Sequence, residues 1–436
     1  MTTRTLRIPL AGGTQELLPR SEDYWPSLLK NAVGAIESDR NLRSRGKYQV
    51  HSAVSKAIVY LFSLLNHCSI DYAAEELNAL VLAMESHAPH FFKDGRQRRA
   101  FPHQTDVNTF LREVGPRRAL KIAQESLDRQ LVDALSRNLV RQRVVVIFDF
   151  NEQAYFGQRD DKAICGTTRQ RGTKKMRHYL HWMVVSGKVH LFAGMHLVKV
   201  GESKIPIVKT ALEHLAALGF EIATVLWDRE FYRAELVDAV KSTGADMLMP
   251  AKIYKRVATL IDEYLAGSRG RVIKYTFSTS TANNQRIAVR AWLVLGATKQ
   301  QNLGAIRRAC QSGSLPASEA RKSIYAFLVV RRPRSRAGSS ESKLSHRYKC
   351  RWQVETGFSD KNQLAPRWRT NVDHERLLGE IGRCLIYNAW QLMAAGERQQ
   401  SARERPVRLR EGIDALKRAV QIHILQDRMK GVKLTQ

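Results

Sequence analysis

Three acidic residues stand out because their type and setting suit metal-assisted chemistry. Asp149 follows the apolar run of residues 144–148, Asp228 follows residues 222–227, and Glu355 lies far downstream. A continuous apolar run of this length is typical of a buried strand, and the acid then stands at its carboxyl end. Carboxylate oxygens are the ligands that hard divalent cations prefer. The three acids therefore indicate a divalent metal site, provided that the fold brings them together.

Glu355 shares a predicted helical face with two further polar residues. Tyr348, Arg351 and Glu355 stand at positions i, i+3 and i+7, so a helix over residues 348–355 places a phenol, a guanidinium and a carboxylate on one side. The forked N–H donors of arginine suit a phosphate group. A polar face of this kind favours a functional site over core packing.

Each acid taken alone also has a simpler interpretation. Asp228 could cap the helix that follows it, and Glu355 could pair with Arg351 across one helical turn. Asp149 could be a nucleophile like that of haloacid dehalogenases, although the residues after it, Phe-Asn-Glu-Gln, lack the second Asp of that family. The order and context of the three acids together favour catalysis.

The segments that carry these acids resemble those of a known enzyme family. Val-Ile-Phe-Asp149-Phe, Leu-Trp-Asp228-Arg-Glu-Phe-Tyr and Tyr348-xx-Arg351-xxx-Glu355 are similar to the DDE transposases of bacterial and archaeal insertion sequences, in the group with a Tyr-Arg-Glu-Lys (YREK) signature. The resemblance covers residues 141–396. It implies an α/β protein with a ribonuclease H-like catalytic core, and two Mg²⁺ ions, replaceable by Mn²⁺, held by the three acids.

The resemblance also implies a reaction and its partners. Strand cleavage at the end of an insertion sequence would free a 3′-hydroxyl, which would then be transferred to target DNA. Double-stranded DNA, as terminal inverted repeats and as target, would be the partner of a homodimer in the synaptic complex. Tyr348 and Arg351 match signature residues that contact phosphate near the cleaved bond.

The signature lysine is where the chain departs from the family pattern. Six residues separate glutamate from lysine in the family, whereas five separate Glu355 from Lys361, and Asn362 holds the expected position. On a regular helix this difference rotates Lys361 by about 100° from the active face. The helix could end near Gly357, or Lys361, Asn362 or Arg367 could take the role. We expect Lys361 to be the DNA contact.

Composition supports a polyanionic partner. The 436 residues include 71 Lys and Arg against 41 Asp and Glu, which gives a formal net charge of +30. Charge of this size, spread through a chain that is 44% hydrophobic, favours nucleic acid over a membrane. The five cysteines show no zinc-binding spacing, and no apolar segment has the length of a membrane span. We expect a cytoplasmic, nucleoid-associated protein that does not enter a membrane.

Periodicity predicts how the chain is organised around the acids. The apolar spacing is helical before residue 140. The next segment alternates between predicted strands and helices, and after residue 250 the pattern has a period of two. The predicted parts are a helical N-terminal domain (1–140), the first part of the core (141–250), a mostly β insertion (251–330), the second part of the core with the Glu355 helix (331–396) and a basic helical tail (397–436). The N-terminal domain could grip terminal repeats or be an ordinary helical bundle.

Basic segments are candidate DNA contacts. Arg169, Arg171, Lys174, Lys175 and Arg177 lie within nine residues without an acid, in a segment that we predict to be a long loop over residues 151–177. Residues 93–99, 331–347 and 409–425 are also basic, and each could instead be a solvated surface segment. An aromatic residue that stacks a flipped base could be Tyr325 or Phe327, although core packing explains either.

Two further functions compete with that of an active transposase. A catalytically inactive DNA-binding protein derived from a transposase would explain the irregular lysine spacing, but it has no reason to keep three acids. A general nuclease or resolvase on the same core would not need the segment between Asp228 and Glu355 to be so long.

Overall fold

The computed structural model describes residues 34–36, 39, 51–84, 101–158, 162–170, 172–280, 285–297, 302–333, 344, 347–364, 370 and 372–400. They group into two compact units, one of Arg141–Phe358 and one that joins Met1–Val140 to Ser359–Gln436. The predicted basic segments 93–99 and 409–425, the tail beyond residue 400 and most of 331–347 lie outside the described residues.

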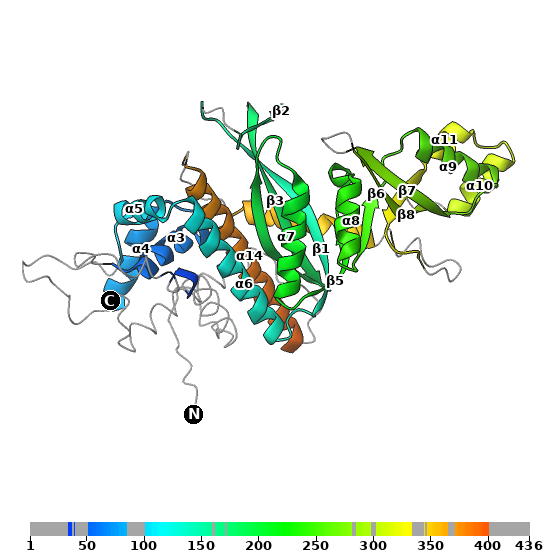
Figure 1. Cartoon of the computed structure of the whole chain (residues 1–436). Helices are drawn as coiled ribbons and strands as arrows, with labels where there is room; N and C mark the ends of the chain where they lie inside the picture. The colour runs from blue at the N-terminus through cyan, green and yellow to red at the C-terminus, as the bar shows by residue number, and fades with distance from the viewer. Residues whose placement is uncertain are drawn as a thin grey trace, which may run out of the picture. The chain divides into compact units, whose positions relative to one another are not determined.

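The unit Arg141–Phe358 is built on one mixed sheet of nine described strands (Figure 1). The strands are β1 (Arg143–Ala154), β2 (Cys165–Gln170), β3 (Thr173–Ser186), β4 (Val189–Val198), β5 (Glu221–Leu226), β6 (Asp246–Pro250), β7 (Val272–Ser280), β8 (Arg286–Ala297) and β9 (Ile324–Val329). On one side of β1, β3 and then β4 pair antiparallel, and on the other side β5 and then β6 pair parallel. This is the predicted ribonuclease H-like arrangement.

The apolar run before Asp149 explains why β1 is central. Val144, Val146, Ile147 and Phe148 are each at most 1% exposed, because the strand has neighbours on both edges and side chains packed on both faces. The two helices α7 (Lys204–Ala217) and α8 (Ala234–Ser242) connect β4 to β5 and β5 to β6. Each helix is followed by a glycine with positive φ, Gly219 and Gly244, a conformation that suits the end of a helix.

The segment between β6 and α13 (Trp352–Asn362) extends the same sheet. β9 pairs antiparallel with β6, β8 with β9, and β7 with β8. The three strands confirm the period-two prediction. Helices α9 (Lys255–Ala266), α10 (Leu303–Gln311) and α11 (Ala317–Lys322) accompany them and were not predicted.

The predicted loop over residues 151–177 is largely β structure. β1 continues to Ala154, and β2 and β3 form a hairpin whose turn contains Gly172 at φ 86°. Thr173 Oγ1 donates to the Tyr155 carbonyl at 2.8 Å, and the Tyr155 N–H donates to the Lys175 carbonyl at 2.8 Å. Backbone pairing thus orders a basic segment that the sequence analysis predicts to be a loop.

The second unit is helical over its described residues. It contains α3 (Ala53–Leu65), α4 (Ile70–Met84), α5 (Gln104–Val114), α6 (Pro116–Ser136) and α14 (Asp373–Gln400). Helix α14 packs on α6 and α3. Gln130 donates to the Leu385 carbonyl at 3.0 Å, and Gly382 lies so close to Leu64 that a Cβ there would stand 2.4 Å from a leucine methyl carbon.

Within the described residues, no single helix has the length and apolar character to cross a membrane. The pair α3 and α4 meets those criteria jointly, but the two helices are bent by 108° at their junction.

Candidate active site

Asp149 lies near the carboxyl end of the buried part of β1, with its side chain 12% exposed. Its Oδ1 accepts a hydrogen bond from the Phe150 N–H at 2.9 Å. Its Oδ2 accepts one from Arg351 Nη1 at 2.8 Å. The first predicted acid is therefore a nearly buried carboxylate with a guanidinium as its charge partner.

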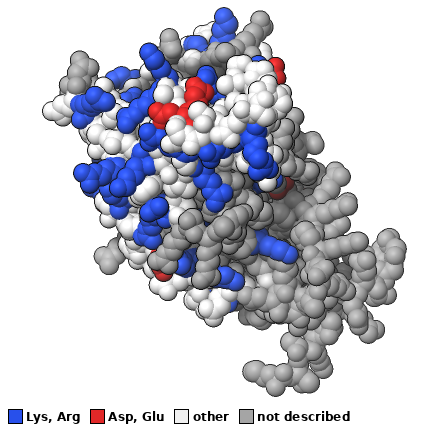
Figure 2. Space-filling view, turned by 90° about the vertical axis from the view of Figure 1, so that its right-hand side faces the viewer, with Lys and Arg blue, Asp and Glu red and all other residues white. Residues whose placement is uncertain are grey.

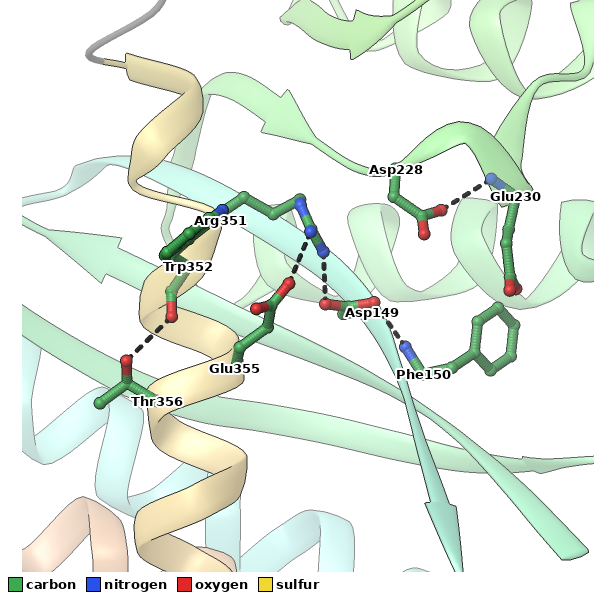
Figure 3. A network of polar contacts seen from close by, with 8 residues as sticks. All are labelled: Asp149, Phe150, Asp228, Glu230, Arg351, Trp352, Glu355 and Thr356. Carbon is green, nitrogen blue, oxygen red and sulfur yellow. Dashed lines mark hydrogen bonds and ion pairs between the residues drawn. The ribbon is translucent and has the colours of Figure 1, made fainter. Parts of the chain in front are cut away.

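Asp228 follows β5, the strand parallel to β1, so its carboxylate points into the same space as that of Asp149 (Figure 3). Its Oδ1 accepts from the Glu230 N–H at 2.7 Å and caps the short 3-10 helix η1 (Arg229–Phe231). The capping interpretation is thus correct for Oδ1. The other oxygen, Oδ2, takes no part in that bond.

Glu355 reaches the two aspartates from the first turn of α13. Two residues fix this helix to the unit: Val354 is fully buried, and the Phe358 ring stacks on Phe192 with centroids 5.9 Å apart. Phe358 also contacts the ring of His181, which pairs with Asp149 across β1 and β3. Helix α13 therefore packs against His181, the residue opposite Asp149 in the sheet, and this contact places Glu355 beside Asp149.

The signature segment differs from the regular helix that the sequence predicts. Residues 347–349 form a helical turn, Cys350 and Arg351 form a tighter turn, and α13 begins at Trp352. The Arg351 N–H donates to the Tyr348 carbonyl at 2.9 Å, three residues back. A turn of this kind has three residues, so Tyr348 and Arg351 still lie on the same side of the chain, as they would on a regular helix.

Arg351 joins two of the acids. Its Nη1 donates to Asp149, and its Nη2 donates to Glu355 Oε1 at 2.6 Å, with the arginine side chain 14% exposed (Figure 3). The predicted pairing of Glu355 with Arg351 across one turn is confirmed. The Tyr348 ring lies against the guanidinium, with 5.8 Å between the ring centroid and Arg351 Cζ, and it also packs on Phe327.

The charges of the site act on one another. Burial raises the pKa of Asp149 to about 6, Arg351 and the Phe150 N–H oppose the rise, and Asp228 and Glu355 add to it. Burial by itself lowers the pKa of Arg351, but Tyr348 and the three acids outweigh it, so the pKa is raised. Burial raises the pKa of Tyr348 to about 12. The three acids thus share one electrostatic environment.

The three carboxylates are suitable ligands for a hard divalent cation, although they do not lie close enough together to bind one. Among the described residues, no group of three acids, histidines or cysteines lies close enough together to hold a metal ion. The guanidinium of Arg351 stands between Asp149 and Glu355 and balances charges that would otherwise repel (Figure 3). Carboxylates are the ligands that Mg²⁺ prefers, and Arg351 occupies one oxygen of Asp149 and one of Glu355.

Lys361 is not an available DNA contact in this structure, which corrects the prediction. Its side chain is fully buried and forms an ion pair with Glu380 of α14, which also pairs with Arg383. Asn362, at the family position of the lysine, is exposed and accepts from Arg383 at 3.2 Å. α13 continues past Gly357, so the offset of one residue turns Lys361 away from the face of Glu355.

Three other predicted DNA contacts, Arg169, Lys174 and Lys175, lie on the β2–β3 hairpin. Lys174 is exposed and Lys175 half-buried, while Arg169 belongs to β2 and Arg171 lies outside the described residues. Arg177 is only 1% exposed, and its guanidinium lies 4.5 Å from the Tyr155 ring centroid. Arg177 is therefore part of the core rather than of a DNA-facing segment.

Of the two aromatic residues considered for stacking a base, both are used in packing. Phe327 is 6% exposed and contacts Tyr348, and the Tyr325 ring covers Gly296. Sequence reasoning missed Trp352, which is 66% exposed beside Arg351, and Lys204, which lies against Phe150. Adjacency to the signature arginine was a signal for Trp352, whereas nothing in the local sequence pointed to Lys204.

Comparison with known proteins identifies the family. Residues 142–388 match the family described as Transposase DDE domain. No curated protein sequence matches the chain. Among solved structures, the piggyBac transposase synaptic complex with hairpin DNA aligns with 94% of this chain and 79% of that one, at 10% identity and a TM-score of 0.50. The strand transfer complex of the Drosophila P element transposase aligns with 92% and 85%, at 9% identity and a TM-score of 0.24.

Proposed function

Because the chain belongs to the Transposase DDE domain family, we propose that it cleaves DNA at the ends of an insertion sequence and transfers the freed strand to target DNA. The proposal includes the YREK group and a bacterial or archaeal element. Double-stranded DNA would be the substrate, as terminal inverted repeats and as target, and a homodimer would form the synaptic complex.

The observation that carries this proposal is the shared environment of Asp149, Asp228 and Glu355. The three residues come from two parallel strands and one helix, and Asp228 and Glu355 both raise the pKa of Asp149. Burying a carboxylate beside two others costs free energy, which is typical of a functional site. A purely structural role would not require the acids to gather in this way.

These residues would hold two Mg²⁺ ions, with Mn²⁺ as a substitute. When bound, such ions lower the pKa of the attacking water or 3′-hydroxyl and offset charge on the leaving oxygen. Arg351, once released from the carboxylates, can direct two parallel N–H donors at the phosphate next to the cleaved bond. The Phe327 ring supports Tyr348, and Tyr348 supports the guanidinium, which fixes the direction of those donors.

One face of the β7–β8 hairpin supports the assignment of DNA as partner. Neither strand contains Asp or Glu, and Lys274, Arg286 and Arg290 are exposed along one side, while Tyr275 and Phe277 face the core. Lys274 pairs with Trp292, whose ring lies 5.1 Å from the guanidinium of Arg332. Figure 2, which looks onto this end of the unit, shows Lys and Arg over much of the described surface and few acids. Such a face suits a phosphate backbone.

The proposed function is tested with duplex DNA from the flanks of the coding sequence and Mg²⁺. The expected result is cleavage at the element boundary by the natural chain, and binding without cleavage by D149N, D228N and E355Q. D228N is informative because asparagine also caps a helix, so the bond from the Glu230 N–H persists. If D228N cleaves as well as the natural chain, Asp228 is only a cap and the proposal fails.

The second candidate, an inactive DNA-binding descendant, is favoured by the burial of Lys361 and by the ion pairs that occupy the acids. It predicts tight binding to the same DNA with no cleavage in Mg²⁺ or Mn²⁺. The same assay therefore separates the two functions.

A further inference from the structure

Lys204 is the first residue of α7, directly after the helix cap Ser203. Its side chain is 30% exposed and extends over the rings of Phe150 and Phe231, with Nζ 4.3 Å and 5.3 Å from their centroids. The same ammonium lies 3.7 Å from Glu230 Oε2. Lys204 therefore contacts the segment after Asp149 and the segment after Asp228 at once.

The two rings beneath Lys204 belong to an aromatic column that joins β1 to the end of β5. Phe150 stacks on Phe231 with centroids 5.5 Å apart, Phe231 stacks on Trp227 at 5.6 Å, and Trp227 contacts Phe148 at 6.2 Å. Phe148 and Phe150 flank Asp149, while Trp227 and Phe231 flank Asp228. A cation over stacked rings gains from their electron-rich faces, so the ammonium stabilises the end of this column.

The residues that Lys204 holds are those whose backbone N–H groups orient the two aspartates. The Phe150 N–H donates to Asp149 Oδ1, and the Glu230 N–H donates to Asp228 Oδ1. Figure 3 shows the ring of Phe150 and the side chain of Glu230 on the same side of the acids. The ammonium of Lys204 thus contacts a neighbour of each aspartate: the Phe150 ring next to Asp149, and the Glu230 carboxylate near Asp228.

We propose that Lys204 is a positioning residue that fixes the relative placement of Asp149 and Asp228. This inference rests on the proposed function for its catalytic meaning, whereas the positioning itself is a property of the protein without DNA. Lys204 also holds the carboxylate of Glu230, two residues from Asp228, so that this fourth acid stays paired with a cation.

The role requires a long side chain with a positive charge. Arginine keeps the charge and the contact with the rings, while methionine keeps most of the length and removes the charge. We therefore expect K204R to behave much like the natural chain and K204M to lose the positioning. Lys209 is the matched control, because it is exposed on the same helix and pairs with Glu213 at 3.9 Å, away from the aromatic column.

The first test is hydrogen exchange of the DNA-free protein, with no added metal. In K204M, the amides of Phe150 and Glu230 should exchange about fivefold faster, as removal of a partly buried cation–π interaction predicts, with K204R and K209M unchanged. Equal exchange in K204M and the natural chain overturns the proposal. This readout does not depend on DNA cleavage, so it holds whatever the outcome for the proposed function.

The second test compares K204M, E230Q and the double variant in Mg²⁺-dependent cleavage and in DNA binding. We expect each single variant to require a higher Mg²⁺ concentration for half-maximal cleavage, the double variant to be no worse than the poorer single one, and DNA affinity to stay within twofold. Additive losses, or a weaker DNA affinity with unchanged Mg²⁺ dependence, would show that Lys204 acts separately from Glu230 or touches phosphate directly. Either result overturns the inference.

Discussion

The guanidinium of Arg351 lies 2.8 Å from the carboxylate of Asp149, although the two residues are 202 positions apart in the chain. The same guanidinium holds Glu355, so one cation occupies two of the three acids that we assign to metal ions. Arg351 therefore offsets part of the negative charge that the three acids bring together. We expect a metal ion at these carboxylates to compete with this arginine.

Removal of the arginine should affect metal binding and cleavage in opposite directions. R351A frees Asp149 and Glu355 from a competing cation, so Mn²⁺ should bind the DNA-free protein about tenfold more tightly, since a charge-assisted hydrogen bond contributes about 1.5 to 3 kcal/mol. Cleavage should nevertheless fall, because the phosphate loses its donors. Calorimetric titration with Mn²⁺ measures the first effect, with R351K as the charged control. Unchanged or weaker Mn²⁺ binding in R351A would contradict the competition.

Asp149 should make the metal-free protein less stable as pH rises. Its folded pKa of about 6 lies above the ordinary value of 3.8, so the folded state binds more protons between these values. The free energy of unfolding should therefore fall from about pH 4 to about pH 6, by about 1.4 kcal/mol for each unit of pKa difference. D149N lacks this fall. Urea unfolding in EDTA at several pH values measures the difference, and a constant difference between the two proteins would refute the assignment.

Lys361 should matter for folding rather than for DNA binding. Its ammonium and the Glu380 carboxylate are both fully buried, so K361A leaves a buried carboxylate with less compensation. Loss of one partner of a buried ion pair costs about 3 to 5 kcal/mol, which urea unfolding would detect. A K361A protein of natural stability with weaker DNA binding would restore Lys361 as a DNA-binding residue.

The basic face of β7 and β8 should contribute to DNA affinity without sequence preference. In the variant K274A/R290A, the logarithm of the affinity for unrelated duplex DNA should depend less steeply on the logarithm of salt concentration, by about 0.9 for each phosphate that the variant no longer neutralises. K209A/K241A removes the same charge from exposed positions on α7 and α8. Binding isotherms at several salt concentrations compare the two, and equal slopes would exclude the hairpin as a DNA-binding surface.

Sequence patterns predicted the parts of this fold that depend on local apolar periodicity. The apolar runs before Asp149 and Asp228 form parallel neighbouring strands, and β7, β8 and β9 lie in the segment where a period of two predicts strands. Helix α9 could also have been found, because Val257, Ile261, Tyr264 and Leu265 have helical spacing before Gly267, which adopts φ 95°.

Other features depend on residues that are distant in sequence. Lys361 is buried because Glu380 faces it from another helix, and Arg177 is buried because the Tyr155 ring covers it from outside its own strand. The pairing of Arg351 with Asp149 has the same origin. Charge patterns along the chain predict which residues could bind phosphate, but only the fold shows which of them are already neutralised.

Replacement of each acid by cysteine tests most directly whether these side chains touch the metal. Hard Mg²⁺ binds carboxylate well and thiolate poorly, whereas Mn²⁺ is more tolerant of a softer ligand. D149C, D228C and E355C should each fail to cleave terminal-repeat DNA in Mg²⁺ and regain cleavage in Mn²⁺. Cleavage by all three variants in Mg²⁺ at the natural rate would contradict the central claim that the three carboxylates together bind the catalytic ions.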